Sequence, residues 1–184
     1  SGFHLRYDED VMNEEAIEYD ITQAVRLHKK YGLPLETFIY PFNKVGFQQQ
    51  LKDAGIKTYR GLTKMKYQEL PCRPFVRILN FLQNLIGLCP PTVTVTEDES
   101  GLVNIPDSMF ILDQTGIRRF VSKRVLAKRG MKGIKKAVDK REILHIWFHP
   151  YSFSYRNDKF LYSLEKMLEF AAAERRAGNL EIMT

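Results

Sequence analysis

Stretches with helical spacing and short stretches with strand spacing alternate along the 184 residues of this chain. The clearest helical pattern runs from Asn13 to Tyr31, with Asn13 as the expected N-cap and Gly32 after the end. Helical patterns also cover residues 46–54, 75–86, 134–140 and 159–177, and strand patterns cover 37–40, 56–59, 92–96, 108–112 and 143–149. This alternation predicts an α/β fold with largely parallel strands.

The length of the chain fits one domain, so we expect a single domain over residues 1–184. Two cysteines, Cys72 and Cys89, indicate the reduced thiols of a cytosolic protein, with a single bridge between them as the alternative. We find no run of 18 apolar residues and no signal-peptide pattern, so we predict no transmembrane segment and expect a cytoplasmic or membrane-peripheral location. The sequence does not indicate an oligomeric state.

The net charge of +6 is concentrated in one segment. Between Arg118 and Arg141 there are eleven Lys or Arg residues against one acid, Asp139. Such a segment suits the phosphates of a nucleic acid, a lipid headgroup or a nucleotide-linked sugar, and the simpler alternative is a solvated helix face. Phe120 is the only aromatic residue there, which makes nucleic acid an unlikely partner because single strands bind by stacking on aromatic rings.

Candidate chemistry gathers in the strand predicted over residues 143–149. A period of two places His145, Trp147 and His149 on one face and Leu144, Ile146 and Phe148 on the other. The two histidines are then about 13 Å apart at about 3.3 Å per residue, too far to share one metal ion. His149 is the stronger candidate because Pro150 follows it at the end of the strand. For His145 we favour a structural role.

Two further candidate groups follow the first two predicted strands. In Tyr40-Pro41-Phe42-Asn43, the backbone N–H of Phe42 can point into a cavity and stabilise an oxyanion, and Asn43 is a candidate for substrate binding. Arg60 follows the next strand and can hold a carboxylate or phosphate, or orient an acid. The structural alternatives are an Asx turn at Asn43 and a salt bridge at Arg60.

The first residues, Ser1-Gly2-Phe3-His4, suggest part of a metal site, because His4 would share a divalent ion with a histidine placed just before Ser1. Asp8 and Asp10 are better interpreted as capping and dipole partners of the following helix than as metal ligands.

These motifs occur in the order seen in polysaccharide deacetylases. The matching motifs are Ser1-Gly2-Phe3-His4, Tyr40-Pro41-Phe42-Asn43, Tyr59-Arg60-Gly61, Gly101-Leu102-Val103-Asn104-Ile105-Pro106-Asp107-Ser108 and His145-Ile146-Trp147-Phe148-His149-Pro150. The chain resembles the large C-terminal portion of the NodB-homology domain of carbohydrate esterase family 4. The resemblance implies a distorted (β/α) barrel and a hydrolase that removes N-acetyl groups from the amino sugars of a surface polysaccharide or its precursor.

The resemblance also implies roles for single residues. His4 matches a ligand of a divalent metal, usually zinc, in an Asp-His-His set. His149 would protonate the leaving amine and the N–H of Phe42 would help to hold the oxyanion, while Trp147 would line the sugar or acetyl pocket, with Asn43 and Arg60 as further contacts.

The chain departs from the family pattern at its start. The early strand with the base and metal aspartates has no counterpart, so we expect an N-terminally truncated barrel whose activity as given is uncertain. Tyr40 replaces the arginine of the third motif, and Pro150 replaces a common aspartate of the last motif. The alternative function is a noncatalytic deacetylase-like module that binds an anionic glycan or nucleic acid through residues 118–141.

Overall fold

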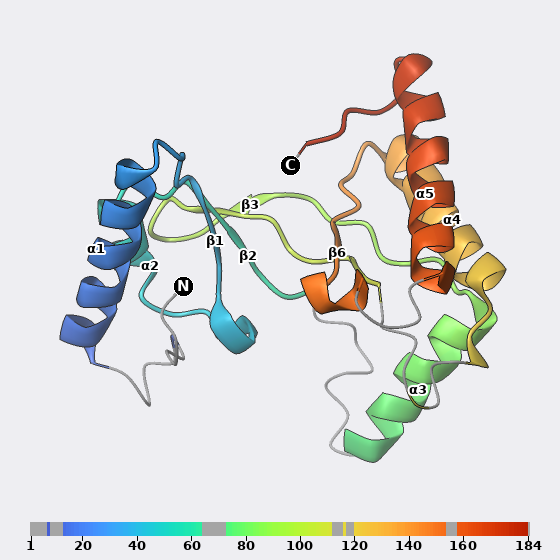
Figure 1. The fold of residues 1–184 in the computed structure, drawn as a ribbon, viewed down its shortest axis with the longest axis horizontal. Helices are drawn as coiled ribbons and strands as arrows, with labels where there is room; N and C mark the ends of the chain where they lie inside the picture. The colour runs from blue at the N-terminus through green and yellow to red at the C-terminus, as the bar shows by residue number, and fades with distance from the viewer. Residues whose placement is uncertain are drawn as a thin grey trace. The chain divides into compact units, whose positions relative to one another are not determined.

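The computed structural model describes residues 7, 13–63, 73–111, 116, 120–153 and 158–183, and only the backbone of Phe42, of residues 73–78 and of Asn80. The described part is a mixed α/β fold (Figure 1). The chain separates into two compact units. Unit 1 consists of Ser1–Leu62 and Thr94–Pro106, and unit 2 of Thr63–Val93 and Asp107–Thr184. The polypeptide therefore leaves unit 1, returns to it and leaves it again.

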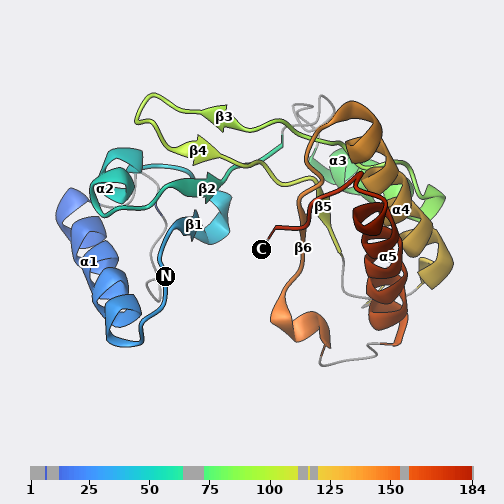
Figure 2. The ribbon, with the colours of Figure 1, turned by 90° about the horizontal axis from the view of Figure 1, so that it is seen from above.

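Unit 1 contains a four-stranded sheet and two α-helices. The helices are α1 (Glu14–Lys30) and α2 (Gln48–Asp53), and the strands are β1 (Thr37–Ile39), β2 (Thr58–Arg60), β3 (Thr96–Glu97) and β4 (Val103–Asn104). The strand order is β1-β2-β4-β3, which Figure 2 shows from above. β1, β2 and β4 are parallel, and β3 runs antiparallel to β4. The carboxyl ends of the three parallel strands therefore meet at one edge of the sheet.

The first helix begins and ends as its sequence predicts. The side chain of Asn13 accepts a hydrogen bond of 2.9 Å from the backbone N–H of Ala16, and Ile17 and Ile21 are buried. These two isoleucines join the core of unit 1 with Phe38 of β1, Leu51 of α2 and Leu102. The core thus combines α1, α2 and the sheet.

Unit 2 contains three α-helices and a two-stranded parallel sheet. Its helices are α3 (Arg73–Ile86), α4 (Lys123–Lys140) and α5 (Asp158–Arg176), and its strands are β5 (Met109–Phe110) and β6 (Ile146–Trp147). A short 3-10 helix, η1 (Pro41–Asn43), follows β1 in unit 1, and another, η4 (Pro150–Phe153), follows β6. α4 and α5 lie side by side (Figure 1).

The last strand confirms the predicted alternation but is shorter than predicted. Leu144, Ile146 and Phe148 are partly buried and pack against the core of unit 2, so the apolar face is the one that contacts the core. Regular pairing covers only Ile146–Trp147, and Ile143 makes an isolated bridge with Val93.

Helix α4 is longer than the sequence predicted. It begins at Lys123, with the side chain of Ser122 as its N-cap, whereas the predicted helix began at Ile134. Small side chains form much of its buried face: Gly130 packs on Met167 of α5, and Gly133 packs on Pro90 and Leu144. A pattern of small residues gives no apolar stripe, which explains why the first half was missed.

Candidate functional site

The predicted catalytic histidine lies in an aromatic cluster at the end of β6. The ring of Trp147 stacks on Phe110 of β5 with 4.2 Å between ring centroids and an angle of 27°. His149 meets the edge of Trp147 at 5.4 Å and stacks on Tyr151 at 4.8 Å. Trp147 and His149 are half-buried, whereas Tyr151 is 59% exposed. The cluster therefore presents an imidazole and an accessible aromatic face together, a combination suited to a polar ligand with an apolar ring face.

Asp107, for which the sequence predicted no separate role, bonds the indole of this cluster. Its Oδ2 accepts a hydrogen bond of 3.2 Å from the indole N–H of Trp147, and its Oδ1 accepts one of 2.9 Å from the backbone N–H of Thr63. The hydroxyl of Thr63 donates to the backbone carbonyl of Asp107 as well. The available signals were the place of Asp107 within the quoted motif Gly101–Ser108 and its position just before the predicted strand at residues 108–112.

His145 is held through its backbone. Its N–H donates to the hydroxyl of Ser108 at 3.2 Å, and its carbonyl accepts from the backbone N–H groups of Ser108 and Met109 at 3.0 Å each. These bonds join the start of β6 to the start of β5. They are compatible with the structural role that the sequence favoured.

The second predicted group lies in unit 1, where the structure brings Arg60 and Asn43 together. Arg60 is 9% exposed, and its Nη2 donates a hydrogen bond of 2.8 Å to the Oδ1 of Asn43. Asn43 has a φ of 55°, a left-handed conformation that Asn adopts more readily than most residues. Arg60 thus contacts an amide here, and this contact fixes the end of η1.

The backbone of η1 leaves the N–H of Phe42 outside its hydrogen bonds. Asn43 donates to the carbonyl of Tyr40 at 3.0 Å, and Lys44 donates to the carbonyl of Pro41 at 3.2 Å. Neither bond uses the N–H of Phe42, the predicted oxyanion donor at the carboxyl end of β1.

Phenol and carboxyl groups meet in the core of unit 1. Burial raises the pKa of Tyr40 and of Tyr59, and the nearby carboxylate of Asp98 raises both further. Burial acts to raise the pKa of Asp98 too, but hydrogen bonds from Ser100 and Leu102 outweigh it and hold this pKa below its ordinary value. The group is therefore an ionised carboxylate beside two neutral phenols.

The predicted metal ligand, His4, lies outside the described residues. Within the described ranges, no three His, Cys, Asp or Glu side chains gather closely enough to hold a metal ion. Trp147 and His149 lie in unit 2, whereas Phe42, Asn43 and Arg60 lie in unit 1. The structure thus forms two local groups of predicted site residues, each within its own unit.

Part of the basic segment has a structural role. Three cations of α4 point at the carbonyls that follow α3: Arg129 Nε lies 3.0 Å from Leu88 O, Lys132 Nζ 3.3 Å from Gly87 O, and Lys136 Nζ 3.5 Å from Pro90 O. Positive charge at the carboxyl end of a helix is stabilising because the carbonyls there carry partial negative charge.

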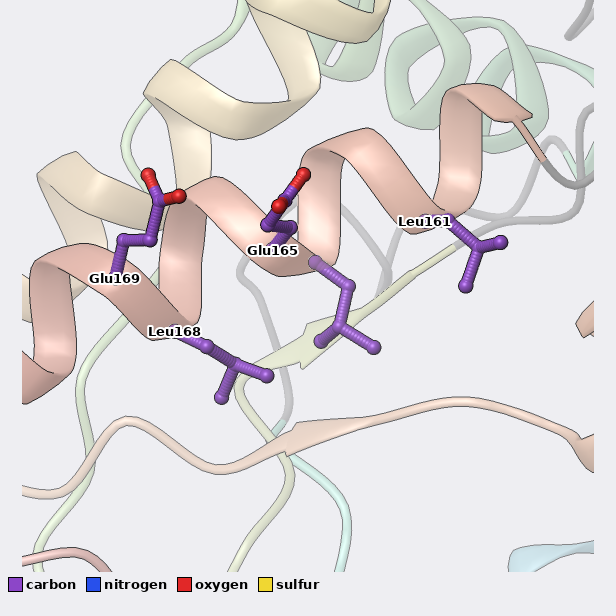
Figure 3. A pocket seen from close by; sticks show the side chains of 5 residues that line it. Leu161, Glu165, Leu168 and Glu169 are labelled. Carbon is purple, nitrogen blue, oxygen red and sulfur yellow. The ribbon is translucent and has the colours of Figure 1, made fainter.

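A surface hollow of about 600 Å³ lies on α5, and no residue of the aromatic cluster is among those that line it. Its lining comes from one helix: Leu161, Leu164, Glu165, Leu168 and Glu169 (Figure 3). The hollow contains no predicted site residue. Separately, no helix in the described part of the chain is both long and apolar enough to cross a membrane.

Comparisons with known proteins give no family for this chain: no family model, no curated protein and no solved structure matches it.

Proposed function

We propose that this chain is a metal-dependent deacetylase that hydrolyses the N-acetyl groups of amino sugars in a surface polysaccharide or its precursor. The proposal includes the distorted (β/α) barrel that the resemblance implies. Its main support is the cluster around His149, because an imidazole beside an accessible aromatic ring suits a sugar that must stack and receive a proton.

In this proposal, His149 donates a proton to the amine that leaves when the amide C–N bond breaks. Tyr151, which is exposed, supplies a ring face for the sugar, and Trp147 forms the apolar wall behind the imidazole. Asp107 acts as a positioning residue because it bonds the indole N–H and so sets the orientation of the ring that His149 meets.

The other roles in the reaction are assigned to residues of the quoted motifs. The N–H of Phe42 is proposed as an oxyanion donor, and Asn43 and Arg60 as substrate contacts. A divalent metal, with zinc as the expected ion and His4 as one ligand, would polarise the acetyl carbonyl. Within the described residues, no group of three candidate ligands marks where this metal would bind.

The alternative function, a module that binds an anionic polymer through residues 118–141, has less support. Arg129, Lys132 and Lys136 contact carbonyls after α3, and Lys135 pairs with Asp139 at 2.5 Å. The carbonyl contacts leave the charges of Lys132 and Lys136 in place, but Arg129 is buried and the charge of Lys135 is balanced by Asp139.

Acetate release from N-acetylated amino-sugar oligomers, measured on the protein with and without added zinc, tests the proposal. We expect His149→Asn to lower kcat by at least about 100-fold, since a general acid contributes on that scale. His145→Asn is the matched control, because His145 is the other histidine of the same predicted strand and has no proposed role in the reaction, and it should change kcat less than about three-fold.

Substrate binding is measured independently through Trp147. It is the only tryptophan of the chain, so its emission reports on the cluster alone. We expect N-acetylated oligomers to shift or quench this emission, and Tyr151→Ala to weaken the effect. No acetate release, together with no spectral response to any N-acetylated oligomer, would refute the proposed function.

A further inference from the structure

Exposed aliphatic side chains surround the carboxyl end of α3. Ile86 is 66% exposed, Leu88 49%, Leu82 40% and Leu85 39%. Leu82 and Ile86 are one helical turn apart and so lie on the same side of α3. Gly87, with a φ of 69°, ends the helix, and the N–H of Leu88 bonds the carbonyl of Gln83 at 3.0 Å. This ending fixes Leu88 beside the last turn.

Cations of α4 lie directly beside these side chains. The ammonium of Lys132 lies 3.3 Å from the carbonyl of Gly87, the residue between Ile86 and Leu88, and that of Lys136 lies 3.5 Å from Pro90 O. Lys128, one turn before Lys132, is exposed. No Asp or Glu occurs in residues 73–96 or 118–138. The surface is therefore aliphatic and positively charged, and the acids that follow, Asp139 and Glu142, bond Lys135 and Thr92.

We propose that this surface, made of Leu82, Leu85, Ile86 and Leu88 together with Lys128, Lys132 and Lys136, docks on an anionic lipid bilayer. An amphipathic helix with apolar side chains on one face and flanking lysines binds in the interface of a membrane, where the aliphatic groups enter the acyl boundary. Lysines adjacent to that face reach the headgroup phosphates with their long side chains.

The side chains favour a lipid over two other partners. Single-stranded nucleic acids bind on aromatic rings that stack on their bases, and duplexes need cations for their phosphates but no aliphatic surface, whereas the four exposed apolar residues here are Leu or Ile. Protein interfaces are depleted in lysine and enriched in aromatic residues and arginine at their centres, which is the opposite of this composition. The charge and the aliphatic groups together match an anionic bilayer.

Vesicle sedimentation on the full chain tests the proposal. We expect binding to vesicles of phosphatidylcholine with about 30% phosphatidylglycerol, little binding to phosphatidylcholine alone, and weaker binding when NaCl rises from about 0.05 M to about 0.5 M. Lys132→Gln with Lys136→Gln should weaken binding at least about ten-fold. The charge-matched control, Lys29→Gln with Lys30→Gln on α1, should leave binding unchanged.

The aliphatic contribution is tested by Ile86→Ser with Leu88→Ser, which should weaken binding about ten-fold or more. Its control is Leu27→Ser with Leu33→Ser, two leucines that are 53% and 58% exposed in unit 1. The circular dichroism of each variant shows whether it folds.

The native thiol of Cys89 can carry a probe, so the proposed surface can be tested without substituting any of its residues. Cys89 is exposed and follows Leu88, and Cys72→Ser makes it the single cysteine of the chain. An environment-sensitive fluorophore on Cys89 should brighten and shift to the blue on anionic vesicles only. Three results would each overturn the proposal. The first is no vesicle binding by the unaltered chain, and the second is an unchanged fluorophore signal when the chain is bound to vesicles. The third is weaker vesicle binding by the lysine variant but not by the Ile86→Ser, Leu88→Ser variant, together with binding of the unaltered chain to an oligonucleotide as strongly as to vesicles.

Discussion

Tyr40 is a buried phenol at the end of β1. The residue is 1% exposed, and its ring meets the edges of Tyr7, Phe38 and Tyr59 at 5.7, 5.1 and 5.6 Å. Its hydroxyl forms no well-aligned hydrogen bond with the described residues. The backbone N–H of Gly46 acts to lower the pKa of Tyr40, but this effect is weaker than the increase that burial causes. The ring therefore contributes packing, while the buried hydroxyl adds a desolvation cost.

Tyr40→Phe should be neutral or stabilising by about 1 kcal/mol at pH 7, because it removes a buried polar group and keeps the ring. Burial raises the folded-state pKa of Tyr40, so the folded protein keeps its phenolic proton while the unfolded chain loses it above about pH 10. Stability linked to this group is thus complete below pH 10 and is lost as the pH rises.

The advantage of Tyr40→Phe over the unaltered chain should therefore grow above pH 10, by at most about 1.4 kcal/mol per pH unit. Urea denaturation at pH 7, 10 and 11 measures it. A stability advantage that stays constant across these pH values would contradict the raised pKa of Tyr40. Tyr19→Phe, at a residue that is 68% exposed, is the control at pH 7 for the loss of a hydroxyl that is not buried.

At the scale of elements, α3 depends on α4 for its carboxyl end. Arg129 is 8% exposed and donates from Nε to the carbonyl of Leu88 at 3.0 Å, inside a face of α4 that is otherwise mostly small or apolar. From the sequence, the basic segment was interpreted either as a solvated helix face or as a surface that binds phosphates. For Arg129 the structure shows a contact that stabilises the neighbouring helix.

We expect Arg129→Met, which keeps much of the apolar side chain, to lower the free energy of unfolding by about 1.5–3 kcal/mol, because hydrogen bonds to charged groups contribute on that scale. Chemical denaturation followed by circular dichroism measures the change. Lys128→Met, on the exposed side of the same helix, should change stability by less than about 0.5 kcal/mol, and equal effects of the two would show that Arg129 does not act through α3.

Local patterns predicted some elements well and others poorly, for identifiable reasons. α1 was predicted closely because Asn13, Ile17 and Ile21 carry its cap and its buried face within one segment. The first half of α4 was missed because Gly130 and Gly133 are buried against distant residues that no local pattern contains. Likewise, His149 and Trp147 were predicted as neighbours from their spacing, whereas Asp107, which precedes Trp147 by 40 residues, required the fold.

At the scale of the molecule, unit 1 is built from two separate pieces of chain. β4 pairs with β2, and Leu102, which is fully buried in the core of unit 1, precedes β4. Both belong to Thr94–Pro106, which follows a segment of unit 2. The residues up to Leu62 alone therefore lack one side of the sheet.

A fragment ending at Pro106 should keep the β1–β2 pairing, and a fragment ending at Val93 should lose it, because the shorter fragment lacks β3, β4 and Leu102. Loss of a buried leucine alone costs about 2–5 kcal/mol. Hydrogen exchange of the backbone amides of Thr58–Arg60 measures the difference. Equal protection in both fragments would show that unit 1 does not need its second piece.

The divided unit 1 has a consequence for synthesis on the ribosome. Nascent domains fold as units, and chains grow at about 5–20 residues per second, so the segment between Leu62 and Pro106 takes roughly 2–9 s to make. During that time β1 and β2 lack β4 and the buried Leu102, on which we expect their pairing to depend, so both strands keep open edges. An open edge pairs readily with other chains, so each newly made molecule passes through a brief period in which a chaperone on the ribosome would protect it from aggregation.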